Sequence, residues 1–325
     1  MSLFDSVLDA SVVLSFDRSG FRRHAKRFVP ADMQVSMQGK TALVTGANSG
    51  IGFSVSKALA ALGATVHLAC RDEGRGQRAL ESIRAELPSA DVHLQKLDVS
   101  LLADVRRFAE TFRGPVDVLV NNAGVLPDTL TRTREGHEVT FATNVLGPHL
   151  LTSALMPRLV VAKGRVITIA SGGMLTQKLD LHALQGQVAK FDGVVAYAQT
   201  KRAEVILSEL WATKQPEVTF STMHPGWADT PAVRSSLPTF YSVTKGILRT
   251  PEQGADTAVW LAVAPRLSGK SGLFWFDRAP ASTHPLGFTK EAPEDREKLW
   301  ALVETACATL KAEWPMPHSA GPTGR

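Results

Sequence analysis

Short apolar runs rich in β-branched residues alternate with longer stretches of helical periodicity along most of the chain. A strand buried on both faces reads as a nearly continuous apolar run, whereas an amphipathic helix repeats its apolar positions about every 3.6 residues. Unbroken alternation of the two predicts a parallel sheet covered by helices. The predicted strands are 41–45, 65–69, 92–97, 116–120, 165–170, 218–223 and 272–276.

The stretches between these strands carry the helical pattern. In the longest of them, Pro148 lacks the N–H that would bond to the carbonyl of Asn144. We therefore predict a bend there and a carbonyl that must find another donor, although a proline kink used only for packing is the alternative. The predicted helices are 50–62, 73–87, 101–112, 135–161, 194–211, 251–263 and 295–314.

No internal repeat and no linker of domain scale interrupts this pattern. The sequence therefore predicts one α/β domain with a doubly wound parallel sheet, over residues 40–285. A helical N-terminal extension, residues 1–39, would precede it. Residues 286–325 would add a C-terminal helix and a tail whose proline, glycine and serine content predicts disorder from 315 onward.

Composition excludes several classes of function. The 36 lysines and arginines against 31 aspartates and glutamates give a net charge of +5, and no basic stripe is interleaved with aromatic residues, so we expect no nucleic-acid partner. Two cysteines, Cys70 and Cys307, cannot form a disulfide framework, and no cysteine or histidine spacing matches a zinc site. These features predict a cytoplasmic protein without a metal.

The N-terminus combines an apolar stretch, residues 4–16, with a basic segment at residues 22–27. Asp5 and Asp9 interrupt the apolar stretch, and the positive charge follows it, which is the reverse of a signal peptide. No uninterrupted apolar run approaches the roughly 18 residues of a spanning helix. Two interpretations remain, a helix packed on the protein body and a peripheral anchor at a membrane surface.

A glycine-rich loop follows the first predicted strand and opens the next helix. Glycines permit a tight turn and a close approach of a pyrophosphate, which the helix N-terminus attracts. The spacing differs from Gly-x-Gly-x-x-Gly, and the lysine of a phosphate-binding P-loop is missing. The alternative is an ordinary turn that happens to contain three glycines. The candidate cofactor residues of this loop are Thr45, Gly46, Asn48, Ser49, Gly50, Ile51 and Gly52.

Tyr197 and Lys201 lie four residues apart in the predicted helix 194–211, so they share one face. A cation close to a phenol favours the phenolate, which makes the pair suitable for acid–base chemistry. The alternative is a half-buried tyrosine followed by a surface lysine. The interpretation gains weight from the other motifs that point to the same place.

Taken in order, these motifs resemble the short-chain dehydrogenase/reductase family. Its pattern is matched by residues 45–52, 121–124, Asn144, Ser171, Tyr197 with Lys201, and residues 225–226, over residues 40–276. The flanking segments 28–30, 171–174, 191–193, 224–231 and 277–284 resemble a single branch of that family. The resemblance implies a Rossmann-type fold and a nicotinamide-dependent interconversion of a carbonyl and an alcohol.

The resemblance also implies roles for four catalytic residues. Tyr197 would be the general acid for reduction and the base for oxidation, while Lys201 would favour the phenolate and hold the nicotinamide ribose. Ser171 would polarise the substrate oxygen. The Asn144 carbonyl would hold a water that links Lys201 to solvent.

Further residues are assigned to the cofactor by the same resemblance. Asp98, with Val99 beside it, would meet the adenine. Asn122, Ala123 and Gly124 would border the cofactor, and Pro225, Gly226 and Thr230 would lie near the nicotinamide.

Arg71 bears on the choice of cofactor. An NAD enzyme usually places an acid after the second strand, roughly 20 residues beyond the glycines, to bind the ribose hydroxyls. Here Cys70 and Arg71 stand at that place. An arginine that bonds to a 2′-phosphate favours NADP(H), while the following Asp72 leaves NAD(H) open.

The sequence indicates the class of substrate less specifically than it indicates the cofactor. Ser171, Tyr197 and Trp227 are the candidate substrate contacts, and the segments 172–193 and 227–246 would wall the pocket with Met174, Leu175, Phe240 and Tyr241. These side chains predict a small apolar or lipid-like carbonyl or alcohol, but they are also ordinary core residues. A dinucleotide-binding sensor or scaffold without turnover is the rival function, and the sequence leaves homo-oligomerisation open.

Overall fold

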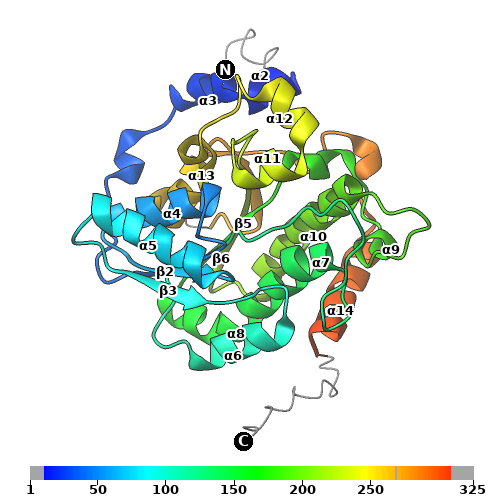
Figure 1. Cartoon of the computed structure of the whole chain (residues 1–325), viewed down its shortest axis with the longest axis horizontal. Helices are drawn as coiled ribbons and strands as arrows, with labels where there is room; N and C mark the ends of the chain where they lie inside the picture. The colour runs from blue at the N-terminus through cyan, green and yellow to red at the C-terminus, as the bar shows by residue number, and fades with distance from the viewer. Residues whose placement is uncertain (1–10, 268, 309–325) are drawn as a thin grey trace, which may run out of the picture.

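A computed structural model describes residues 11–267 and 269–308. An eight-stranded sheet in the order β3-β2-β1-β4-β5-β6-β7-β8 forms its centre (Figure 1). The strands β1 to β7 are parallel, and β8 is antiparallel to β7. Their bounds are β1 Thr41–Thr45, β2 Thr65–Cys70, β3 Val92–Lys96, β4 Val118–Asn121, β5 Arg165–Ile169, β6 Thr219–His224, β7 Leu273–Phe276 and β8 Ala279–Pro280.

This sheet confirms the predicted α/β fold class, including all seven predicted strands. The structure adds β8, which the sequence did not indicate because its two residues are exposed and form no apolar run. The order of strands reverses between β1 and β4, and ligands of open parallel sheets bind at the carboxyl ends of the strands near such a point.

Helices cover both faces of the sheet, with α6 and α8 on one side of it and α4 and α5 on the other (Figure 1). Successive side chains of a strand point to opposite faces, so in β1 Leu43 enters one core while Ala42 and Val44 enter the second. The first core is closed by α6 Leu102–Thr111, α8 Gly147–Ala162, α10 Gly193–Lys214 and α14 Pro293–Ala308, and the second by α4 Gly50–Ala61, α5 Glu73–Glu86 and α13 Pro251–Val263.

The long helix predicted over 135–161 begins later than predicted, with α7 Val139–Phe141. The Glu135 carboxylate instead accepts from the backbone N–H groups at the start of α6, at 2.7 and 3.0 Å. A π-helical turn, Ala142–Leu146, then separates α7 from α8, and the Gly147 N–H donates to the carbonyl five residues back. This irregularity lies where Pro148 predicts one.

Within the described part of the chain, one helical stretch, Val139–Ala162, is long and apolar enough to cross a membrane, with a mean hydropathy of 1.4. Of the 18-residue segment that has this hydropathy, 61% is buried inside the protein. Leu146, Leu151, Leu155 and Leu159 are fully buried in the first core. Because a central helix of a soluble domain has the same composition, the stretch is weak evidence for a span.

Several short helices were not predicted. α9 Leu181–Leu184, α11 Pro231–Ser236 and α12 Pro238–Thr244 lie in the two segments expected to wall the pocket, and each is too short to show a periodic pattern. The N-terminal extension contains α2 Val12–Phe16 and α3 Arg18–Ala25. The apolar residues before position 11, and the predicted helix and tail beyond position 308, lie outside the described residues.

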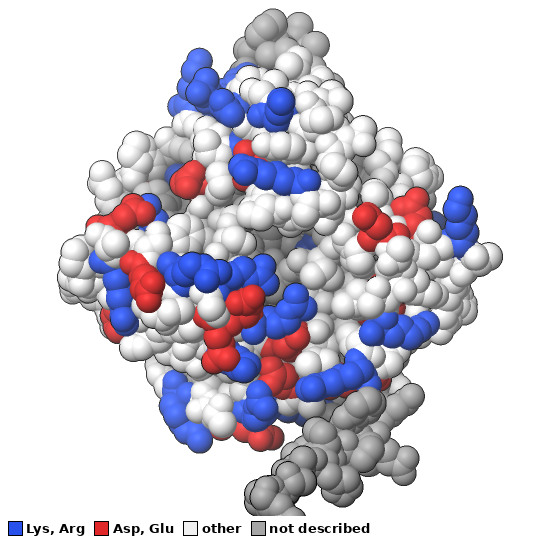
Figure 2. All heavy atoms as spheres, in the orientation of Figure 1, with Lys and Arg blue, Asp and Glu red and all other residues white. Residues whose placement is uncertain are grey.

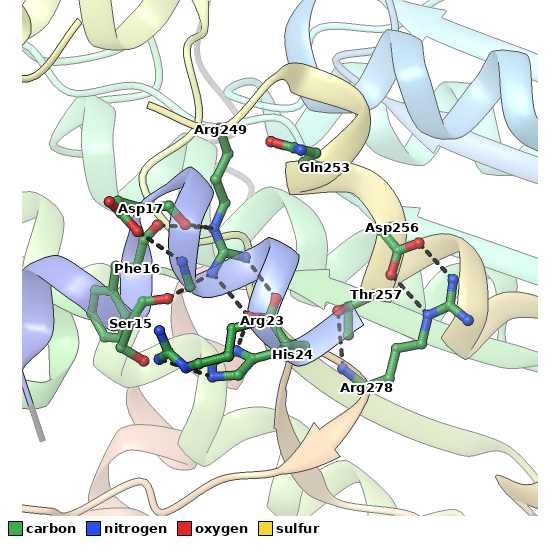
Figure 3. A network of polar contacts seen from close by, with 12 residues as sticks. Ser15, Phe16, Asp17, Arg23, His24, Arg249, Gln253, Asp256, Thr257 and Arg278 are labelled. Atoms are coloured by element: carbon green, nitrogen blue, oxygen red, sulfur yellow. Dashed lines mark hydrogen bonds and ion pairs between the residues drawn. The ribbon is translucent and has the colours of Figure 1, made fainter. Parts of the chain in front are cut away.

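The buried side chain of Arg249 attaches the N-terminal extension to the domain (Figure 3). Its guanidinium donates to the backbone carbonyls of Ser15, Phe16 and Asp17, at 2.9, 2.8 and 3.1 Å. It also forms a bidentate pair with Asp277, at 2.6 and 2.9 Å. These contacts pack α2 and α3 against the protein body. This arrangement agrees with the first of the two interpretations of the N-terminus, a helix packed on the protein body.

Candidate active site

A pocket of about 390 Å³ opens at the carboxyl ends of β1, β4, β5 and β6, beside α10 and α11. In Figure 2 the face in view is hollowed over the end of β5, and the rim of the hollow below α11 is largely uncharged. Fourteen of the predicted site residues line the pocket, which are Gly46, Ser49, Gly50, Ile51, Asn122, Ala123, Gly124, Ser171, Tyr197, Lys201, Pro225, Gly226, Trp227 and Thr230.

The glycine loop requires glycine at the positions where the sequence places it. Gly46 and Gly50 have φ of +65° and +56°, a conformation that side chains disfavour. A Cβ on Gly52 would lie 2.3 Å from the Asn122 side-chain nitrogen. That nitrogen donates to the carbonyls of Thr45 and Gly46, at 2.8 and 3.2 Å, so Asn122 fixes the loop against the end of β4.

The N-terminus of α4 has the features of a phosphate site. Its N-cap residue, Ser49, makes no side-chain capping bond, whereas Asp72 and Asp192 cap α5 and α10. The first backbone N–H groups of α4 therefore keep their capacity to donate, and the positive end of the helix dipole points at the pocket. With the glycines on the same loop, these groups fit a dinucleotide cofactor.

Thr45 holds the sheet together behind this loop and does not line the pocket. Its hydroxyl accepts from the N–H groups of Asn122 and Ala123, both at 3.1 Å, and donates to the Val120 carbonyl at 3.3 Å. The side chain is almost completely buried. Its hydrogen bonds join the ends of β1 and β4.

Lys201 is the buried member of the predicted catalytic pair on α10. Its Nζ lies 5.4 Å from the centre of the Tyr197 ring and donates to the Ile169 carbonyl at 2.9 Å. It also donates to Glu204 at 2.8 Å. Burial lowers the pKa of Lys201, but the Glu204 carboxylate and the Tyr197 phenol outweigh burial and raise the net pKa, so the side chain stays an ammonium.

Ser171 follows β5 and shares the pocket with this pair. Its hydroxyl accepts from the Gly173 N–H at 3.3 Å and thereby caps a short 3₁₀ helix, Gly172–Thr176. The hydroxyl proton remains free to be donated toward the pocket. Ser171, Tyr197 and Lys201 thus line one pocket together with the glycine loop.

Asn144 lies behind the pocket and is fully buried. Its amide nitrogen donates to the Thr200 hydroxyl at 2.9 Å and to the Val125 carbonyl at 3.2 Å, and its amide oxygen accepts from the Val125 N–H at 2.9 Å. The side chain therefore joins the loop after β4 to α10. A Cβ on Gly124 would lie 3.4 Å from Asn144 and 3.6 Å from Lys201, so both side chains border that glycine.

The predicted adenine-side residues lie outside the main pocket. Asp98 accepts from the backbone N–H and the hydroxyl of Ser100, at 3.0 and 2.6 Å. Val99 is buried, and its carbonyl lies where a Cβ on Gly147 would clash. Arg71 is exposed after β2.

A second hollow of about 420 Å³ adjoins the glycine loop on the side of α5. Asn48 and Ser49 line it together with Arg75 and Arg78, two exposed residues that sequence reasoning missed. Their signal was their spacing of three on the helix that follows Arg71. Figure 2 shows basic side chains beside the central hollow on this side.

Apolar residues form another part of the pocket lining. The rings of Trp227 and Phe240 lie edge to face with centroids 5.2 Å apart, and Val194 and Leu237 also belong to this part. Met174 was predicted here, but its side chain is fully buried in a small core behind the wall.

His224 is a pocket residue that sequence reasoning did not identify. Its Nδ1 accepts from the Gly172 N–H at 3.1 Å, and its ring stacks on Phe276 and meets the edge of Phe16. Burial, reinforced by the cation of Arg249, lowers its pKa to about 3. The neutral ring therefore positions the loop that carries Ser171, and its only signal in the sequence is its place at the end of β6.

Residues 40–239 match the family model described as short chain dehydrogenase. The chain belongs to the short-chain dehydrogenase/reductase family. It is accordingly an oxidoreductase that acts on CH–OH groups and carbonyls. The matched range contains the glycine loop, Ser171, Tyr197 and Lys201, so the family assignment and the pocket rest on the same residues.

Curated members of the short-chain dehydrogenase/reductase family match most of this chain. Dehydrogenase/reductase SDR family member 12 of Bos taurus is 44% identical over 301 residues, 91% of this chain and 95% of that protein. Polyprenol dehydrogenase of Mus musculus is 37% identical over 279 residues, covering 81% and 82%. Retinol dehydrogenase 13 of Homo sapiens is 34% identical over 343 residues and covers 98% of each chain.

Proposed function

We propose that the protein is an NADP(H)-dependent oxidoreductase that interconverts a carbonyl and an alcohol on an apolar, lipid-like substrate. The observation that carries the proposal is that Ser171, Tyr197 and Lys201 line the same pocket as the glycine loop. The acid–base pair and the phosphate-binding helix end thus border the same space.

The roles of the side chains follow from their contacts. A bound nicotinamide cofactor supplies or accepts the hydride. The Tyr197 hydroxyl donates a proton to the nascent alkoxide in reduction and takes it back in oxidation. The Lys201 ammonium stabilises the phenolate, and the Ser171 hydroxyl donates a hydrogen bond to the substrate oxygen. Asn144 holds α10 in place, and the π-helical turn around it leaves an irregular backbone close to Lys201.

The surroundings of Arg71 support a preference for NADP(H). Asp72, the residue that left NAD(H) open, caps α5 by accepting from the Arg75 N–H at 2.9 Å and pairs with the Arg75 side chain at 3.0 Å. Its carboxylate is thereby engaged at the N-terminus of α5. Arg75 and Arg78 line the hollow beside the glycine loop, and the exposed Arg71 precedes their helix, so basic side chains are available for a 2′-phosphate.

The apolar wall supports a lipid-like substrate. Trp227, Phe240, Leu237 and Val194 offer no charge to a ligand. The names of two relatives give polyprenol and retinol, which are both apolar isoprenoid alcohols. We therefore propose an isoprenoid or similarly apolar alcohol and the corresponding aldehyde or ketone.

Turnover measurements test this function. NADPH oxidation is followed with all-trans-retinal, a polyprenal, a medium-chain aldehyde and a small water-soluble aldehyde, and NADP⁺ reduction with the matching alcohols. We expect kcat/KM to be at least tenfold higher for the isoprenoid aldehydes than for the water-soluble one, since burying each CH₂ stabilises the complex by about 0.8 kcal/mol. Cofactor binding without turnover of any compound would instead indicate a sensor or scaffold.

We also propose that the N-terminal end of the molecule contacts a membrane surface. Val12, Val13 and Leu14 of α2 are 55%, 44% and 40% exposed. Exposed basic residues follow nearby, with Arg22 in α3 and Lys26 and Arg27 directly after it. Figure 1 shows α2 and α3 at the same end as α12, whose Val243 is 80% exposed and whose Phe240 lines the pocket. An apolar substrate dissolved in a bilayer would therefore meet the pocket from this end.

Sedimentation with vesicles tests the membrane contact. Replacing Val12, Val13 and Leu14 together by serine is expected to lower the fraction bound to anionic phosphatidylserine vesicles severalfold, because the apolar face of α2 is lost. Val161→Ser is the matched control, since Val161 is 80% exposed on α8. Equal sedimentation of the triple variant and the wild type would leave α2 as a packed helix only.

A further inference from the structure

A buried carboxyl group forms an ion pair with the predicted catalytic lysine. Glu204 lies one helical turn beyond Lys201, and its Oε1 accepts from Lys201 Nζ at 2.8 Å. Both side chains are only 4% exposed. A buried ion pair of this kind is weak evidence for stability, because the desolvation of both charges offsets their attraction. A role in the chemistry of Lys201 explains the carboxyl group better.

The second oxygen of this carboxyl group faces a polar cavity. Among the described residues, neither Glu204 Oε2 nor Asn121 Oδ1 has a hydrogen-bond partner, although both atoms are buried. Both residues line a cavity of about 30 Å³, to which Thr168 and Ser208 also contribute. A cavity of this size with several polar groups is large enough to hold an ordered water molecule. Such a water would satisfy the two oxygens.

The wall of this cavity includes His149, which connects it to α14. This residue lines the same cavity and is buried, with its Nδ1 accepting from the Trp211 indole N–H at 3.2 Å. Its other nitrogen, Nε2, contacts Glu304 of α14 at 2.7 Å. The Glu304 side chain is 49% exposed. Glu204 and the cavity thus lie next to Lys201, and His149 links the wall of the cavity to the partly exposed Glu304.

We propose that Glu204 exchanges the catalytic proton between Lys201 and solvent through this cavity. The proposal rests on the function proposed above. It assigns to Glu204 a positioning and proton-storing role behind Lys201, without contact to substrate. The Asn144 carbonyl, to which family resemblance assigns the relay water, belongs to a residue that lines the same cavity, so Glu204 adds an ionisable group to that place.

The proton transfers balance both for reduction of the carbonyl and for oxidation of the alcohol. During reduction, the substrate oxygen takes the phenolic proton of Tyr197, and the phenolate regains a proton at the expense of the Lys201 ammonium. The carboxylic acid of Glu204 then loses its O–H proton to the Lys201 amine, and the carboxylate recovers a proton from solvent by way of the cavity water. One solvent proton is consumed for each alcohol formed, and the three side chains return to their starting states. Oxidation reverses each transfer.

Glu204 is suited to this exchange at neutral pH. Burial raises its pKa from 4.5 to about 7, against the opposing effect of Lys201. The charged and titratable groups around it are Lys201 and Tyr197 on α10, His149 on α8 and, beyond His149, Glu304 on α14. An acid with a pKa near the working pH is present in both forms and can pass a proton in either direction.

Infrared titration of the cofactor-free protein tests this assignment without any turnover. The wild type is expected to show a protonated-carboxyl absorption that disappears with a midpoint near pH 7, and Glu204→Gln is expected to lack it. Glu209→Gln, on the same helix but paired with Arg296, is the matched control and keeps the absorption. A midpoint below pH 5, or an unchanged absorption in Glu204→Gln, would overturn the proposal.

Chemical unfolding gives a second test. Because the folded state holds the Glu204 proton up to about pH 7 and the unfolded state releases it near 4.5, the free energy of unfolding of the wild type should fall, relative to Glu204→Gln, as the pH rises between these values. Above about pH 7 the difference should stay constant. A difference that does not change with pH contradicts the raised pKa.

Kinetics separate proton exchange from a structural role. At pH 7, kcat of Glu204→Gln should fall on the order of tenfold, less than the 10²- to 10⁴-fold typical of a direct general acid, because Glu204 acts through Lys201, and its pH profile should lose the inflection near pH 7. The Kd for NADPH should stay within about twofold, and Glu204→Asp should recover part of the rate with a shifted inflection. An equal loss at every pH with the inflection retained contradicts the proposal. Absence of turnover in the wild type would defeat the proposed function alone, since the infrared result still decides whether Glu204 titrates.

Discussion

Tyr197→Phe is expected to lower kcat by roughly 10²- to 10⁴-fold, the usual range for loss of a general acid. The substitution removes only the ionisable hydroxyl, while the ring still packs against the pocket wall. The Kd for NADPH should therefore remain within about twofold of the wild type. Single-turnover rates with an established aldehyde and fluorescence titration of NADPH measure the two quantities separately.

The chain supplies its own control for this experiment. It contains two tyrosines, and Tyr241 does not line the pocket but lies over the Arg234 guanidinium, 5.6 Å from ring centre to cation. Tyr241→Phe makes the same chemical change and should leave kcat nearly unaltered. If both variants kept wild-type rates, the proton donor would have to be sought elsewhere, first at Ser171, the other hydroxyl of the predicted catalytic set.

Arg71→Asp is expected to shift the ratio of the Kd values for NADPH and NADH toward NADH by roughly a hundredfold or more, near 3 kcal/mol at 1.4 per decade. The variant loses a hydrogen bond to the 2′-phosphate and also repels it, and specificity is the difference between the two affinities. Arg75 and Arg78 remain in the variant, so NADPH binding should weaken without vanishing. Fluorescence titration of both reduced cofactors gives the ratio.

A matched control for charge reversal is available on the opposite side of the molecule. Arg113 follows α6 and is exposed, so Arg113→Asp changes the net charge equally without touching the cofactor region. Its Kd ratio should equal that of the wild type. A wild type that binds NADH as tightly as NADPH would contradict the assignment of Arg71 to the 2′-phosphate. Asp72 would then be the candidate that binds the ribose hydroxyls.

Local chemistry explains what could be predicted from the sequence. Most of the parallel strands are largely buried, so each stands out as an apolar run, whereas the edge strand β3 alternates apolar and polar residues and leaves His93 and Lys96 exposed. The glycine loop was predictable because its glycines follow a strand directly, and Gly46 and Gly50 do have positive φ. Tyr197 and Lys201 are four residues apart on one helix. Because this spacing places two side chains on the same face, the pair could be recognised from the sequence alone.

Other features depend on contacts between distant parts of the chain. Arg249 and Ser15 are 234 positions apart, and no periodic pattern connects them. The long helix was predicted to start too early because the role of Glu135 as a cap for α6 lies in tertiary structure. Glu204 reads as an ordinary helical glutamate until its burial against Lys201 is known.

The Arg249 contacts have a consequence for where this protein can be cut. The family model starts at residue 40, which suggests a domain that is complete without the preceding segment. A chain shortened to that point would lose the three carbonyls that receive the Arg249 guanidinium, together with His24, which binds Asp277 at 2.6 Å. A cation buried at 1% exposure would then face a single carboxylate, and the loop of Trp227 would lose its backbone bond to Phe16. We therefore expect the smallest unit that folds stably to be larger than the range of the family model, and excision of the leading segment to disturb the substrate pocket.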